Sequence, residues 1–396
     1  MGSGLLRSPP RAKISPFPSE RTDKGMVIIP SRRNPIRVAF VDCLLGTGKE
    51  GGADVATREL AGRLAERGLF IRVFAYGQGI DLRMPSFLRT APLVRELTAF
   101  PLAGKRAMRL AEAYGFHLVH LNSLPLASLY RSSLPVVVTL HNIQSQKFSR
   151  HGERGRLPLL YNPLVRAPFH FLENRSLTNV DRFLPVNRSM QEFLHREWCV
   201  PEERITRIPN GVDTALFRPS SRRNRRVIFV GRATPPKGFP DLLRAAPAIQ
   251  APILVVTTKM SRRAAARARG AGMEVRFDLS HAELAPEMAA STLLVLPSWD
   301  EEQPLVILEA MACGIPVVTT PEGASDLVED GVNGLVVPAG NPRALAEAVN
   351  RLLEDPVLAA SMGEAGRSLA EEKYAWDKVV ERVMAVYDDL LAGRGR

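Results

Sequence analysis

The chain has 396 residues, 45% of them hydrophobic and 24% charged, which is enough for two domains with cores of their own. It contains no apolar run of about eighteen residues, as a transmembrane helix requires, and no helix-turn-helix, zinc-finger or aromatic–basic RNA-binding signature. We therefore expect neither a membrane span nor a nucleic-acid partner. The net charge of +12 is uneven: residues 1–218 hold 32 Lys and Arg against 18 Asp and Glu, a net charge of +14, whereas the remainder carries −2. This excess indicates either a partner surface or simply codon composition.

The N-terminal segment 1–35 is rich in proline and in scattered basic residues, and it lacks the continuous apolar core of a secretory signal. We expect it to be a disordered basic leader. The three cysteines, Cys43, Cys199 and Cys313, lie far apart, and no cluster of Cys and His has zinc spacing. We expect reduced core cysteines in a cytoplasmic protein, and no metal site.

Apolar runs alternate with helical stretches through the first half of the chain, which predicts a parallel, doubly wound sheet. The loop after the first run, 43–52, is rich in glycine and precedes an amphipathic helix at 54–67. It is not a phosphate-binding P-loop, because Cys43 and Glu50 stand where that motif needs Gly and Ser or Thr. Its backbone N–H groups could still approach an anion, although a plain turn is the alternative. The strands are predicted at 37–42, 71–76, 118–121, 136–140, 183–186 and 205–208.

Two histidines fall on these strands. His120 lies inside one, and we interpret it as a packed core residue. His141 ends the apolar run 135–140, so it should project at the carboxyl edge of the sheet, where open α/β sheets bind their ligands.

A polar, proline-containing stretch at 219–224 has the composition of a linker. We place a domain boundary there, which gives a first domain at 36–218 and a second at 219–375, followed by a last helix within 376–396. In the second half we predict strands at 227–230, 253–257, 275–277 and 292–296, and helices at 239–246, 341–353, 357–372 and 376–391.

The loop 231–238 carries Arg232 and Lys237, five residues apart, beside Gly231 and Gly238. Arginine offers a fork of donors and lysine a point charge, so such a loop at the carboxyl end of a strand can enclose a diphosphate. The alternative is an ordinary solvated loop.

The stretch 297–318 reads PSWDEEQPLVILEAMACGIPVV and is typical of a strand end, a loop, a helix, a turn and a strand start. Glu301 falls in the loop, whereas Glu309 falls in the helix among apolar residues, where a charge is costly without a partner. We expect that partner to be a ligand. Pro304 suits the first helical turn, so the free N–H groups of Leu305 and Val306 would favour a phosphate. Two glutamates on a solvated face are the alternative.

These motifs resemble those of the retaining family-4 glycosyltransferases, which have the GT-B fold. The resemblance rests on the pattern Glu301, seven residues, then Glu309 through Val317, and on the pair Gly-Arg and Lys-Gly at 231–238. It covers about residues 37–392 and is thin at 81–131 and 144–176. The family has a histidine or His-Asp step where this chain has His141-Asn142, and paired glycines where it has Gly51 and Gly52.

The resemblance implies two doubly wound Rossmann-like domains that face across a cleft, with the C-terminal helix returning to the first domain. The second domain would hold a nucleoside-diphosphate sugar, which is a co-substrate, so we expect no cofactor. The resemblance implies a hexosyltransferase. No Asp-x-Asp pair occurs, so we expect this enzyme to be metal-independent. The implied catalytic set is His141, Arg232, Lys237 and Glu301, and the implied donor-binding set is Gly51, Gly52, Gly231, Arg232, Lys237, Glu301, Gln303, Pro304, Leu305, Val306 and Glu309.

The chain departs from the family pattern at Asn122, at Asp278 and at Gln303-Pro304. Asp278 stands where the family usually has glycine, in the loop that frames the nucleobase, so the base stays open. Two other classes also stay open: a GT-B-like sugar-nucleotide epimerase, and a non-catalytic assembly subunit that binds sugar nucleotides or glycans.

The acceptor is the subject of a further hypothesis. Basic residues lie beside apolar ones in the first half, as an interfacial segment requires. We hypothesise a glycan or lipid-linked acceptor of polysaccharide biosynthesis, reached by peripheral contact with an anionic membrane at its cytoplasmic face. The alternative is that the apolar residues face the core. The residues concerned are Lys105, Arg106, Arg109, Arg150, Arg154, Arg156 and Arg166, with Leu159, Leu160, Tyr161, Leu164, Phe169 and Phe171.

Overall fold

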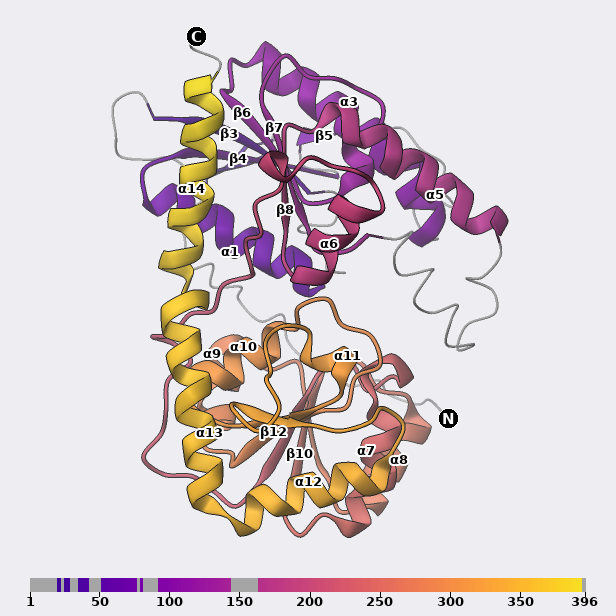
Figure 1. Ribbon diagram of the computed structural model, residues 1–396, viewed down its shortest axis with the longest axis vertical. Coiled ribbons are helices and arrows are strands. Elements are labelled where there is room, and N and C mark those ends of the chain that lie inside the picture. The colour runs from indigo at the N-terminus through magenta and orange to yellow at the C-terminus, as the bar shows by residue number, and fades with distance from the viewer. Residues whose placement is uncertain are drawn as a thin grey trace, which may run out of the picture.

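The computed structural model describes residues 20–22, 25–28, 35–42, 51–76, 79–80, 92–143 and 163–393. Two α/β lobes follow one another along the chain, and the C-terminal helix runs beside the first of them (Figure 1). Each lobe is built on one sheet whose strands are mostly parallel and are separated by helices in sequence. This is the doubly wound arrangement that the alternation of elements predicts.

The first sheet has the order β1-β2-β4-β3-β6-β7-β8, and β5 pairs with β4. The pairings from β4 to β8 are parallel, whereas β1 and β2 are antiparallel. The strands are β1 (Glu20–Thr22), β2 (Gly25–Ile28), β3 (Arg37–Val41), β4 (Phe70–Tyr76), β5 (Gly79–Ile80), β6 (Leu118–Leu121), β7 (Val136–Leu140) and β8 (Arg182–Pro185).

The segment 1–35 was expected to be disordered. This expectation is wrong for β1 and β2, because these two strands extend the sheet from β4. The strand expected at 205–208 is also wrong. Only a single bridge joins Ile205 to Phe183 there, since the chain leaves the sheet edge after β8.

Helices cover both faces of the first sheet. Val38 and Phe40 of β3 pack in one cluster with α1 (Gly52–Glu66), whereas Ala39 and Val41 pack in another with α3 (Pro92–Ala113). Successive side chains of a strand point to opposite faces, so a strand covered on both sides is apolar throughout. Two further helices belong to this lobe, α5 (Pro163–Ser176) and α6 (Arg188–Arg196).

The second sheet is parallel throughout and has the order β11-β10-β9-β12-β13-β14. Its strands are β9 (Val227–Val230), β10 (Ile253–Thr257), β11 (Glu274–Phe277), β12 (Leu293–Leu296), β13 (Val317–Thr319) and β14 (Gly334–Val336). Around them lie η5 (Pro235–Lys237), α7 (Phe239–Ala245), α8 (Arg262–Gly270), α9 (His281–Ala289), α10 (Leu305–Ala312), α11 (Pro321–Ala324), α12 (Pro342–Glu354) and α13 (Pro356–Leu369).

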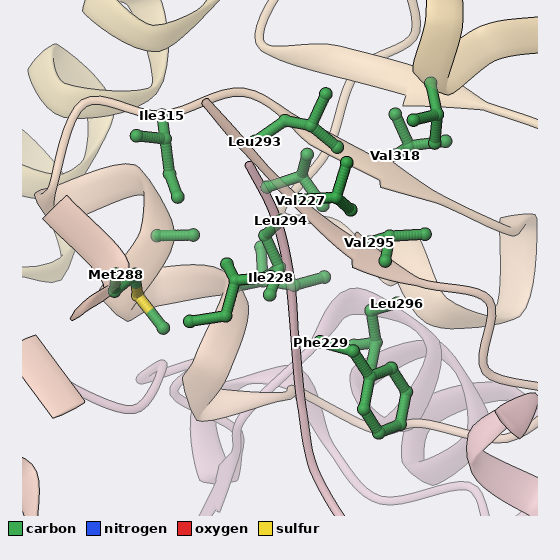
Figure 2. Close-up of a cluster of buried hydrophobic side chains, with 14 of the residues drawn as sticks. Val227, Ile228, Phe229, Met288, Leu293, Leu294, Val295, Leu296, Ile315 and Val318 are labelled. Carbon is green, nitrogen blue, oxygen red and sulfur yellow. The ribbon is translucent and has the colours of Figure 1, made fainter. Parts of the chain in front are cut away.

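The core of the second lobe is centred on β9 and β12, which lie side by side. Figure 2 shows the side chains of both strands packed together, with Met288 of α9 and Ile315 nearby. The residues from Val227 to Phe229 and from Leu293 to Leu296 are almost fully buried. This rigid centre carries the loops that follow β9 and β12.

The C-terminal helix α14 (Trp376–Gly393) returns to the first lobe, as predicted. Its residues Trp376, Val383 and Tyr387 are buried in the same cluster as α1. Before it, α13 ends in the π-helical turn η7 (Ala370–Tyr374). The expected boundary at residue 219 falls too late, because Val212 and Phe217 already belong to the core of the second lobe.

Two further expectations concern a membrane-spanning helix and the cysteines. Within the described residues, no helix is both long enough and apolar enough to cross a membrane. Cys313 is buried, but Cys199 is exposed, so the expectation that the cysteines are core residues is wrong for Cys199. Cys43 lies outside the described residues.

Candidate active site

The start of α10 lies between the two lobes. The sequence suggested that Pro304 lies in the first turn of this helix. Instead, Pro304 is the N-cap, and Leu305 is the first helical residue. Helix geometry leaves the N–H groups of Leu305 and Val306 without intrahelical acceptors, and the helix dipole adds positive potential there. An anion is therefore favoured at this helix start.

The start of α1 faces the start of α10. A Cβ placed on Gly52 would lie 3.8 Å from Leu305 Cδ1, and the Leu305 side chain packs against the hydrophobic clusters of both lobes. The N–H of Gly51 itself is not free, since it donates to Asp54 Oδ2 at 2.6 Å. The first turn of α1 thus lies next to the first residue of α10.

Lys237 and Glu301 form an ion pair beside these helix starts. Their Nζ and Oε1 atoms are 2.5 Å apart, and the Glu301 side chain is only 8% exposed. Ser298 Oγ donates to the same carboxylate oxygen at 2.9 Å. Glu301 is thereby held by two donors, and Lys237 is fixed at the cleft rather than extended into solvent.

A glycine makes this pairing possible. Gly238 follows Lys237 with φ of +67°, and a Cβ there would meet the carbonyl oxygen of Pro297 at 1.7 Å. Only glycine fits this combination of left-handed backbone and close approach. The loop after β9 can therefore lie directly against the loop after β12.

The loop after β12 is held rigidly. The N–H of Trp299 donates to the carbonyl of Pro236 at 2.8 Å, and its indole Nε1 donates to the buried Asp241 at 2.7 Å. Thr320 donates to the carbonyl of Ser298 from the next loop. Arg232 lies exposed on the neighbouring loop after β9.

Glu309 has a protein partner that the sequence analysis missed. Its carboxylate lies 3.5 Å from His281 Nε2, and its side chain is 10% exposed. Burial raises the pKa of Glu309, and nearby His281 lowers it. The expectation that a ligand partners Glu309 stays a prediction, beside this histidine. The capping box of Ser280 and Glu283 starts α9 at His281, which was the available signal.

The two histidines of the first lobe differ. His120 is 2% exposed and shares hydrogen bonds with Tyr387 of α14 at 2.5 Å and with Thr139 at 2.7 Å, which confirms the core interpretation. Burial lowers its pKa to about 3. His141 lies at the end of β7 in a small recess that Asn122 and Asn210 also line. Burial lowers the pKa of His141 to about 4, so it is a neutral imidazole at pH 7.

Two departures from the family pattern have a structural reason. Asp278 adopts φ of +53°, a left-handed conformation that glycine favours and aspartate tolerates. Gln303 turns its side chain to the first lobe, where Oε1 accepts a hydrogen bond of 2.6 Å from the N–H of Asn210.

Among the described residues, no three His, Cys, Asp or Glu side chains form a set that could hold a metal ion.

Both lobes match the models of known protein families. The description "Glycosyltransferase Family 4" matches residues 50–216, and "Glycosyl transferases group 1" matches residues 224–355. The D-inositol 3-phosphate glycosyltransferase of Acidothermus cellulolyticus is 29% identical over 426 aligned residues, which cover 94% of this chain and 92% of that protein.

Solved structures share the fold. Sucrose-phosphate synthase from Thermosynechococcus elongatus superposes with a TM-score of 0.74 at 22% identity, over 90% of this chain and 99% of that one. Anabaena HepE, solved with UDP and glucose, gives a TM-score of 0.65 at 20% identity, over 89% and 99% of the two chains. The fold is that of the GT-B glycosyltransferases. The chain belongs to the family-4, group 1 glycosyltransferases.

Proposed function

We propose that this protein transfers a hexosyl group from a nucleoside-diphosphate sugar to a hydroxyl group of a glycan or lipid-linked acceptor, with retention of anomeric configuration. The observation that carries the proposal is the Lys237–Glu301 pair of 2.5 Å beside the start of α10. One cation, one carboxylate and one helix N-terminus meet there, opposite Gly52.

The diphosphate would lie at the start of α10, with Lys237 and Arg232 as its cationic partners. As the bond between the anomeric carbon and the phosphate oxygen breaks, negative charge grows on the diphosphate, and fixed donors aimed at it stabilise the transition state. The bond to the acceptor oxygen forms on the same face of the sugar. The acceptor's proton passes to the leaving phosphate oxygen, so the products are the glycoside and a nucleoside diphosphate.

The remaining site residues have separate roles in this proposal. Glu301 would accept hydrogen bonds from sugar hydroxyls, and Glu309 with His281 would meet the ribose. His141, neutral at pH 7, would contact the sugar from the first lobe. HepE, solved with UDP and glucose, supports a uridine diphosphate sugar as the first donor to test.

Membrane contact remains part of the proposal, at the cytoplasmic face. Phe171 on α5 is 63% exposed and Leu102 on α3 is 44% exposed, while Arg106 and Arg109 are exposed on α3. Phe169, which the sequence had grouped with these apolar residues, is instead fully buried. Residues 150–162 lie outside the described residues. Co-sedimentation with anionic and neutral liposomes at low and raised salt tests the contact, and charge-independent or absent binding would favour a soluble acceptor.

A donor screen tests the enzymatic proposal. The protein would be incubated with UDP-glucose and GDP-mannose, with and without sugar acceptors, while released nucleoside diphosphate is measured. We expect one donor to be consumed faster when an acceptor is present. Conversion of the donor into an isomeric sugar nucleotide would instead indicate an epimerase, and donor binding without turnover would indicate a binding subunit.

A further inference from the structure

A cavity of about 960 Å³ lies between the two lobes. The start of α6 lines it from the first lobe, and α11, η7 and the loop 299–301 line it from the second. Glu301 is part of the wall, so the cavity adjoins the proposed donor site. Its size falls in the range of about 300–1,000 Å³ that small-molecule sites occupy.

The lining has two features of a site for sugar hydroxyls. Trp299 and Tyr374 supply aromatic rings, and the Trp299 ring is held in place by its hydrogen bond of 2.7 Å to Asp241. Ionised carboxylates are acceptors only, so they suit hydroxyl or amine donors. The cavity is lined by two cations, Arg188 and Lys373, and by a larger number of carboxylates. These carboxylates belong to Glu192, Asp300, Glu301, Glu322, Asp326 and Glu329.

One of these carboxylates fills a position that would otherwise suit a phosphate. The N–H of Arg188, the first residue of α6, donates to Asp326 Oδ2 at 3.0 Å. The Arg207 guanidinium donates to the same oxygen at 2.7 Å. A helix N-terminus next to an arginine is a typical arrangement for binding a phosphate. Here Asp326, from the second lobe, already occupies it.

We propose that Asp326 takes the place of an anionic group on the acceptor, so that the cavity accepts an uncharged or amine-bearing sugar and excludes a phosphorylated one. The inference rests on the proposed transfer to a hydroxyl, and it names the acceptor class. A phosphate group in the cavity would compete with Asp326 for Arg207 and would be repelled by the other carboxylates. The chain would then differ from its relative whose name specifies inositol 3-phosphate.

The test uses glucose and glucose 6-phosphate as probes, with dissociation constants measured by NMR titration in the presence of saturating UDP. For the wild-type protein we expect glucose to bind at least tenfold more tightly than glucose 6-phosphate. Asp326→Asn should tighten glucose 6-phosphate binding at least tenfold and change glucose binding less than threefold. The matched control Asp389→Asn removes a carboxylate of α14 that pairs with Arg182 of β8, and it should change neither dissociation constant.

The double variant Asp326→Asn with Arg207→Ala should lose the gain, because Arg207 is the cation that Asp326 releases. Equal or tighter wild-type binding of glucose 6-phosphate, or no gain in a folded Asp326→Asn protein, would overturn the inference. If circular dichroism shows that the variant is unfolded, the wild-type comparison decides alone. Failure of the proposed function is a separate result. It would be seen in the donor screen, where no nucleoside diphosphate would be released, and not in the dissociation constants of glucose and glucose 6-phosphate.

Discussion

The backbone N–H of Asn210 donates a hydrogen bond of 2.6 Å to Oε1 of Gln303, and both residues are less than 10% exposed. Next to it, Asn187 of the first lobe donates through Nδ2 to the carbonyl of Glu302 at 2.7 Å. These bonds join the first lobe and its linker to Glu302 and Gln303, two of the three residues between Glu301 and α10. The geometry of the proposed donor site is therefore coupled to the relative position of the lobes.

The variant Gln303→Ala tests this coupling. It leaves the buried N–H of Asn210 without its acceptor, which costs about 1–3 kcal/mol. We expect kcat to fall about tenfold while the dissociation constant of the donor changes little, because α10 itself is intact. Steady-state kinetics and calorimetric titration separate the two effects. Gln250→Ala is the control, since its contacts in the structure are made by the backbone; equal kcat for the two variants would contradict the coupling.

The variants Lys237→Ala and Arg232→Ala test the diphosphate site. If each cation acts like an oxyanion donor, its loss should cost about 2.7–4 kcal/mol, or 10² to 10³ in kcat. Arg343→Ala, on the surface of α12, controls for loss of positive charge. Single-turnover rates at saturating donor give the measurement. Unchanged turnover in both variants, with intact folding, would remove the diphosphate from this position.

Much of this site follows from sequence because the elements around it are strongly patterned. The apolar strands β9 and β12 are readable in the chain, and they place Lys237 and Glu301 in loops that follow two neighbouring strands. The ion pair itself was not predicted, because it depends on the close approach of Gly238 to Pro297. The bonds of Gln303 and Asp326 with the first lobe could not be predicted in this way. They depend on how the two lobes are oriented relative to each other. The hydrophobic pattern of a single strand or helix carries no information about that orientation.

The same limit explains His281. Sequence shows that Glu309 lies in an apolar helix, but the histidine at 3.5 Å comes from the preceding helix α9. The mutual packing of α9 and α10 decides this contact. The antiparallel strands β1 and β2 were missed for a different reason, since a proline-rich and basic composition favours disorder and does not reveal the free edge of β4.

Glu309→Gln should have opposite effects on stability and on donor binding. Burial raises the pKa of Glu309 in the folded protein, so its contribution to stability is fully present below pH 4.5 and is lost as the pH rises through the raised value. The neutral amide avoids this loss. We expect a higher Tm at pH 8 than for the wild type, a smaller difference at pH 4, and weaker donor binding. An unchanged donor affinity would exclude Glu309 from the ribose site.

His120→Gln should flatten the acid side of the stability profile. The unfolded chain protonates His120 near pH 6.5, whereas the folded protein does so only near pH 3. Stability is therefore present above pH 6.5 and is lost as the pH falls towards 3; at pH 5 the loss is about 2 kcal/mol. Urea unfolding at pH 7 and pH 5 measures it. The variant should be less stable at pH 7, because the bonds to Tyr387 and Thr139 are lost, but its stability should fall less on acidification. An equal fall would place the proton uptake elsewhere.

The anomeric configuration of the first-formed product tests the central claim most directly. With the donor and acceptor found in the screen, proton NMR would follow the anomeric signals of the donor and the product while nucleoside diphosphate accumulates. A retaining transfer predicts an α-linked product from an α-linked donor, formed in equal amount to the released diphosphate. An inverted product, or an isomerised donor with no diphosphate released, would contradict the account.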